Sequence, residues 1–153
     1  MFDPEQFSTQ TVQGRSSTEA IPIPEGFYTS APKRFEFSQI STKNGPAIIC
    51  KIEWPIVDEA ARQATGRPQS LARQTIWIDT KIVDGKEIFD SDKGMNVGVG
   101  HLREALEQNT PDQEWNFHMI VGVPAKVMVQ HRSGKDGQVY AEVTKVFNIN
   151  AEV

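Results

Sequence analysis

The stretch SLARQTIWID, residues 70–79, carries two side chains with clear chemical potential, Arg73 and Trp77. If this stretch is a strand, Ile76 and Ile78 lie on one face, and Arg73 and Trp77 lie on the other. An exposed indole can stack on an unpaired nucleobase, which contributes about 1–3 kcal/mol per base, while a nearby guanidinium neutralises phosphate. The spacing therefore predicts a site for single-stranded nucleic acid on the outward face of this strand. The alternative is that Trp77 packs beneath a neighbouring loop or the N-terminal segment.

Further basic and aromatic residues are expected to border this site. Lys51 falls on the outward phase of the preceding strand, and Tyr140 falls on the outward phase of the last strand. Tyr140 is either a second stacking platform or one half of an ordinary cross-strand pair. The remaining candidates lie near the first strand and in two hairpin turns: Lys33, Arg34, Lys43, Arg132 and Lys135.

Composition restricts the class of protein. The 153 residues are 38% hydrophobic and 24% charged, which is typical of one globular domain. Lys and Arg number 16 against 20 Asp and Glu, so a nucleic-acid surface has to be locally basic on an acidic protein. Cys50 is the only cysteine, which excludes an internal disulfide and favours a reducing cytoplasm. No apolar run approaches the roughly 20 residues of a membrane-spanning helix, so we expect no membrane partner.

No residue pattern indicates an enzyme. The three histidines lack metal-ligand spacing. The acidic residues of the central region fall at expected turns and strand ends, where aspartate is common: Asp79, Asp84, Asp90 and Asp92. The glycines of GMNVGVG, residues 94–100, do not form a phosphate-binding loop and indicate close packing of a helix on a barrel. We therefore expect no catalytic activity, no cofactor and no metal.

Hydrophobic periodicity predicts five strands and one main helix. The strands are expected within residues 26–40, 47–56, 70–79, 117–132 and 138–147. A short helix is expected after Asp58, and a hairpin extension over residues 82–90. The main helix is expected within residues 91–111, with Thr110-Pro111 at its end and an Arg103–Glu107 pair on its surface. Its expected buried stripe is Val99, Leu102, Ala105 and Leu106.

The order of three strands, a helix and two strands is that of the five-stranded Greek-key OB-fold barrel, an all-β fold with one main helix. Trp54 alternates in phase with aliphatic residues and is expected in the core. Residues 26–148 are predicted to form the barrel, after an extended N-terminal arm of residues 1–25 and before a short tail of residues 149–153. Phe2 and Phe7 are the residues that can anchor the arm.

Three segments resemble a family of small tailed-phage early proteins that are similar to phage single-stranded-DNA-binding proteins. These segments are RQTIWID, DKGMNVGVGHLREALEQN, and VGVPAKVMVQHR with DGQVYAEVTKV, and the similarity covers about residues 24–147. The resemblance implies an OB-fold protein that coats single-stranded DNA during phage replication or recombination in the host cytoplasm.

Two other functions remain open from the sequence. A phage decoration or tail protein of the virion would use the N-terminal arm to clasp another copy of the chain. An inhibitor of a host protein would use the exposed aromatic side chains on a protein surface. An open Trp77 favours the DNA-binding hypothesis, whereas an arm ordered against another subunit favours the virion hypothesis.

Overall fold

The computed structural model describes residues 1–153, and 40% of them lie in strands. The strands are β1 (Gly26–Ser30), β2 (Arg34–Thr42), β3 (Gly45–Ile56), β4 (Ser70–Ile78), β5 (Thr80–Val83), β6 (Lys86–Phe89), β7 (Ala125–Ser133) and β8 (Val139–Phe147). The helices are α1 (Pro4–Ser8), α2 (Glu59–Thr65), α3 (Val97–Ala105) and the 3₁₀ helix η1 (Phe117–Ile120). The expectation of a mostly β protein with few helices is confirmed. No helix is both long enough and apolar enough to span a bilayer.

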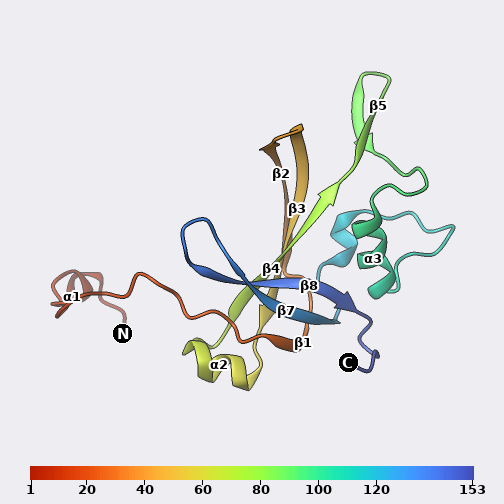
Figure 1. The fold of residues 1–153 in the computed structure, drawn as a ribbon. Coiled ribbons are helices and arrows are strands. Elements are labelled where there is room, and N and C mark those ends of the chain that lie inside the picture. Colours follow the sequence, from red (N-terminus) through yellow and green to blue (C-terminus); the bar gives the residue numbers. More distant parts are fainter.

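The main sheet has six strands in the order β1-β7-β8-β4-β3-β2, and its hydrogen bonding is not closed (Figure 1). The sequence predicted five strands because residues 26–40 read as one strand. The chain bends at residues 31–33, so β1 pairs with β7 at one edge of the sheet and β2 pairs with β3 at the other. Pro32 at this bend is fully buried, and it has no backbone N–H to donate to a ladder.

The bend also changes which side chains of the first strand face the core. The alternation of residues 26–40 predicts Phe27, Ala31, Phe35 and Phe37 on one face, but Phe27 is 50% exposed. Tyr28 is the buried aromatic of β1, and its hydroxyl donates to the Pro24 carbonyl at 2.6 Å. The irregular residues at the bend interrupt the period of two, so the phase of β2 does not carry back into β1.

The strands β3 and β4 form the centre of the sheet and supply much of the core. Cys50, Ile52, Trp54 and Ile56 of β3 are buried as their alternation predicts. Trp54 is fully buried, and its indole N–H donates to the Gln74 side-chain oxygen at 2.9 Å. Because the indole N–H has an acceptor, the core contains a tryptophan without an unsatisfied buried polar group.

Helix α3 packs against β4 and β8 with its expected stripe buried: Val99, Leu102, Ala105 and Leu106. The helix ends at Ala105, well before Thr110-Pro111, because Glu107 takes a left-handed conformation with φ of 58°. Arg103 donates to the Gln108 carbonyl at 3.0 Å instead of pairing with Glu107. The end of the helix and this ion pair were therefore predicted wrongly.

Residues 117–124 were predicted as the first part of the fourth strand, but they are not in a strand, which begins only at Ala125. Phe117–Ile120 form η1, which inserts Phe117 and Ile120 into the core. The Asn116 side chain accepts from the His118 N–H at 3.0 Å and begins this turn. A short apolar run such as FHMIV fits a buried strand and a buried helical turn equally well.

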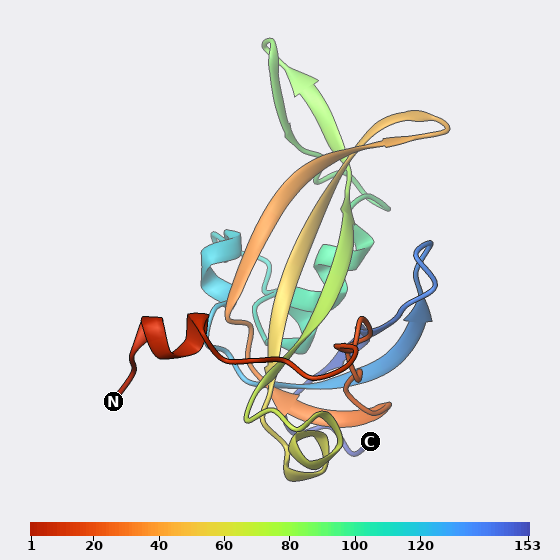
Figure 2. The ribbon, with the colours of Figure 1, turned by 90° about the vertical axis from the view of Figure 1, so that its left-hand side faces the viewer.

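The hairpin β5–β6 projects from the body beyond the end of β4, as Figures 1 and 2 show. It turns at Asp84-Gly85, both with positive φ, as its turn sequence predicts.

The N-terminal segment extends away from the body in Figure 1 and crosses in front of the lower part of β3 and β4 in Figure 2. Residues 1–21 are exposed throughout, and α1 contributes no buried residue. The last part of the predicted arm packs on the body: Ile23 is buried in the core, and the Glu25 carboxylate accepts from the His131 N–H at 2.9 Å.

Candidate nucleic-acid interface

Trp77 lies on the outward face of β4, as the alternation of that strand predicts. Ile76 and Ile78 are buried at 5% and 8% exposure, whereas Trp77 is 58% exposed. Its cross-strand neighbour on β3 is Ile49, which is only 4% exposed. The indole therefore stands beside an apolar floor with much of its surface open to solvent, as a stacking platform requires.

Two hollows border Trp77. One, of about 430 Å³, lies between β4, α3 and β8 and is also lined by His101 and Lys145. The other, of about 300 Å³, lies between the β2–β3 hairpin and the base of β5. The hollow between β4 and β8 exists because these two strands run parallel and pair at only one position, Arg73 with Glu142. Beyond that position α3 occupies part of the space between the two strands.

Arg73 shares the outward face of β4 with Trp77, with Thr75 between them. It lies in register with Glu53 on β3 and Glu142 on β8, yet it makes no ion pair within 4.0 Å. Lys51, which is in register with Thr75, is likewise exposed and without an ion pair. Of the predicted site residues, Arg73 and Lys51 are therefore the two cations at the centre of the face that make no ion pair.

A small hollow of about 110 Å³ collects the charged residues of this face: Arg34, Glu36, Lys51, Glu53 and Arg73, with Phe35 beside them. Arg34 is committed to Glu53 through two contacts, Nε to Oε2 at 2.7 Å and Nη2 to Oε1 at 3.0 Å. This bidentate carboxylate raises the pKa of Arg34 further above its ordinary value. Three of the nine predicted residues therefore converge at one place, and one of those three is already paired.

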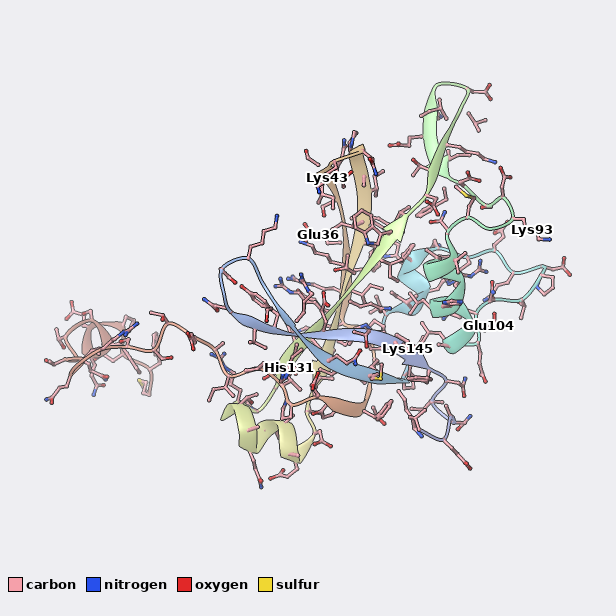
Figure 3. The ribbon with its side chains drawn as sticks, viewed as in Figure 1. Glu36, Lys43, Lys93, Glu104, His131 and Lys145 are labelled. Carbon is pink, nitrogen blue, oxygen red and sulfur yellow. The ribbon has the colours of Figure 1, made fainter.

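The predicted rim residues lie at separate ends of the face. Lys43 is at the tip of the β2–β3 hairpin, with Glu36 lower on β2 (Figure 3). Lys33 lies at the opposite end of β2, in the bend, where its N–H donates to the Glu53 carbonyl at 2.9 Å. Arg132 and Lys135 lie on the β7–β8 hairpin, and the Arg132 Nε contacts the Glu142 Oε1 at 2.9 Å.

Tyr140 is half exposed but tethered to its own hairpin. Its hydroxyl donates to the Asp136 carboxylate, which raises the pKa of Tyr140 and lowers the pKa of Asp136. Its ring also lies so close to Gly134 that a Cβ there would meet it at 2.6 Å. This packing holds the ring against the loop and favours a role in the hairpin's own structure.

The sequence drew attention to the cations of this face but missed the carboxylates among them. Glu53 and Glu142 lie on the same row of the sheet as Arg73, and Glu36 lies in register with Lys51. Glu142 is two residues from Tyr140 on β8, so strand alternation alone puts it on the same face. Its position beside β4 depends on the parallel pairing, which no local signal reveals.

A second aromatic group lies outside the predicted site. Phe37 of β2 contacts Phe117 at a ring distance of 4.9 Å and Phe89 of β6 at 6.0 Å. Phe37 and Phe89 remain 40% and 44% exposed. The sequence did not indicate this group because its members come from three distant segments.

Comparisons of the chain with protein-family models, with curated proteins and with solved structures found no match.

Proposed function

We propose that this protein is a phage single-stranded-DNA-binding protein that coats DNA during replication or recombination in the host cytoplasm. Trp77 stacks on a base, while Arg73 and Lys51 neutralise phosphates on the same face. Lys43 and Lys33 extend the basic contacts toward the two ends of β2, and Lys135 extends them along the β7–β8 hairpin. No bond is made or broken, so the protein acts by binding alone.

We also infer that the sheet is an OB barrel whose first strand is bent. The two edge strands, β1 and β2, are consecutive in the chain and are separated only by residues 31–33. Taken together they pair with β7 on one side and β3 on the other, so the covalent bend connects the two edges of the open sheet. OB folds are partly open Greek-key barrels, and they bind oligonucleotides on their second and third strands. In this chain those strands correspond to β3 and β4.

The exposure of Trp77 is the observation that carries the proposal. An aromatic residue that is 58% exposed on a central strand loses the hydrophobic stabilisation that burial would give. A role in stacking explains that position, and the uncommitted charges of Arg73 and Lys51 supply the electrostatic contribution that strand binding needs.

Titration of tryptophan fluorescence with oligo-dT at low and moderate salt tests the proposal. Oligo-dT should quench the tryptophan fluorescence of the wild-type protein at low salt and quench it less as salt rises. Binding releases counterions from the DNA, so added salt weakens binding. Trp77→Leu keeps an apolar side chain but removes the stacking surface, and should lower the affinity about 5- to 150-fold. Because Trp77→Leu removes one fluorophore, its affinity is measured by anisotropy of labelled oligo-dT.

Leu71→Ala is the matched control, since Leu71 is exposed on the same face of β4. It should bind oligo-dT like the wild type. If the wild-type protein gives no fluorescence or anisotropy response at low salt, the DNA-binding proposal is wrong.

One observation favours the alternative of a virion β-barrel protein. Phe2 and Phe7 of the N-terminal arm pack on each other, with ring centroids 5.5 Å apart, and are 73% and 58% exposed. Such a pair could anchor the arm on a second copy of the chain. This alternative predicts that the full chain is an oligomer by light scattering and that deletion of residues 1–21 makes it a monomer.

A further inference from the structure

Two arginines of the candidate interface are held by carboxylates, and the two ion pairs differ in burial. The Glu53 side chain is 11% exposed, whereas the Glu142 side chain is 24% exposed. Arg34 donates two hydrogen bonds to Glu53, whereas Arg132 and Glu142 form an ion pair in which Nε lies 2.9 Å from Oε1. The Arg132 side chain itself is 61% exposed.

These differences determine which arginine can leave its partner for a DNA phosphate. If Arg34 left Glu53, a largely buried carboxylate would lose its two charged hydrogen bonds, which is costly. If Arg132 left Glu142, water could solvate the freed carboxylate. Exchange of a carboxylate for a phosphate therefore requires less free energy at Arg132 than at Arg34.

The position of Glu142 gives it an effect on more than one cation. It is in register with Arg73 of β4 on one side and with Gln130 of β7 on the other, and it contacts Arg132 from the β7–β8 hairpin. A phosphate that approached both Arg73 and Arg132 would meet this negative charge. The row of residues Arg34, Glu53, Arg73 and Glu142 thus alternates in sign across four strands, and Arg132, in register with Tyr140, contacts its acidic end.

We propose that Glu142 is a built-in competitor of DNA phosphate for Arg132, and that Arg132 exchanges Glu142 for a phosphate when the strand binds. This inference rests on the proposed DNA-binding function. In this proposal Arg132 of the β7–β8 hairpin is paired with Glu142 in the free protein and contacts phosphate in the complex. Glu142 thereby keeps the affinity moderate, so that the protein can be removed from the strand.

A double-mutant cycle tests this competition, using anisotropy of labelled oligo-dT at several salt concentrations. Glu142→Gln keeps the shape of the side chain and removes its charge, so it should tighten binding about two- to fivefold, the range expected for an exposed ion pair. The slope of log K against log salt should stay that of the wild type, because Arg132 neutralises one phosphate in both proteins, whereas Arg132→Gln should make the slope shallower by about 0.7. In an Arg132→Gln background, most of this gain should be lost, and only the smaller effect of Glu142 on Arg73 should remain.

Glu114→Gln is the control for net charge, since Glu114 is exposed and makes no side-chain contact with the candidate interface. It changes the formal charge by the same amount and should leave affinity within error of the wild type. A gain from Glu142→Gln that equals the Glu114→Gln effect, or that is undiminished in the Arg132→Gln background, overturns the proposed exchange.

The outcomes separate this inference from the function on which it rests. If wild-type protein binds oligo-dT and Trp77→Leu weakens that binding, the DNA-binding function stands, whatever Glu142→Gln does. If neither the wild type nor Glu142→Gln binds at low salt, both proposals are overturned.

Discussion

Asn96 and Asp79 are joined by three hydrogen bonds that fasten the start of α3 to the end of β4. The Asn96 N–H donates to the Asp79 carboxylate at 2.7 Å, and the Asn96 side-chain amide exchanges two bonds with the Asp79 backbone, both at 2.8 Å. The same amide group also donates to the Asp90 carbonyl at 2.9 Å. One side chain therefore holds both ends of the β5–β6 hairpin, next to Trp77.

Removal of this clamp should loosen the hairpin. Asn96 has a positive φ of 52°, which glycine tolerates better than alanine. Asn96→Gly should lower the free energy of unfolding by about 1–3 kcal/mol through the lost hydrogen bonds, and Asn96→Ala by about 1 kcal/mol more through strain. Urea unfolding measures both, and hydrogen exchange should accelerate in residues 80–89. Equal stability of the two variants would contradict the strain contribution.

The buried Trp54–Gln74 hydrogen bond should be sensitive to loss of its acceptor. Gln74→Leu leaves the indole N–H without a partner and should lower the free energy of unfolding by about 1–3 kcal/mol. Gln74→Glu retains an acceptor oxygen and is the matched control. In a Trp54→Phe background, which has no donor, Gln74→Leu should cost much less. Urea denaturation of the four variants completes the comparison, and an equal cost in both backgrounds would show that the bond is unimportant.

Cys50 should make stability fall at alkaline pH. Burial raises the pKa of its thiol from 9.0 to about 12. Between these values the unfolded chain releases the thiol proton while the folded chain retains it. The unfolded state then binds fewer protons, so stability decreases as pH rises. The decrease attributable to this group approaches about 1.4 kcal/mol per pH unit. Urea unfolding of the wild type and Cys50→Ala from pH 8 to about 11 isolates it, and parallel pH profiles would refute it.

Two glycines of α3 should respond in different ways to the same substitution. A Cβ at Gly98 would lie 3.1 Å from the Ile76 Cγ2, whereas a Cβ at Gly100 would meet nothing within 4 Å. Gly100→Ala should therefore stabilise the protein by about 0.5–1 kcal/mol through helix propensity. Gly98→Ala should gain less or lose stability, because it crowds a buried side chain. Thermal unfolding compares them, and a larger gain at Gly98 would show that the close packing of helix on sheet is not tight.

The candidate site was predictable where it depended on the period of a single strand. The burial of Ile76 and Ile78 requires Trp77 and Arg73 to face outward, whatever the rest of the chain does. The ends of α2 were predictable for the same reason. Asp58 caps its first turn and Gly66 ends it in a left-handed conformation, and each acts only on the nearest turn of backbone.

The features that were missed depend on contacts between distant segments. Glu142 approaches Arg73 only because β8 pairs parallel with β4, and Phe89 contacts Phe37 although β6 and β2 belong to different sheets. Pro32 allows a bend, but the effect of that bend on the phase of Phe27 depends on the pairing of β1 with β7. Local propensity carries no information on such pairings.

The bend at residues 31–33 has a consequence for synthesis on the ribosome. Gly26 pairs with Val129, about a hundred residues later in the chain, whereas β2 finds its partner β3 immediately. At about 5–20 residues per second, the first half of the bent strand emerges roughly 5–20 s before its partner. During that interval β2 and β3 can pair while β1 has no partner, and the sheet is completed only after β7 and β8 have been made.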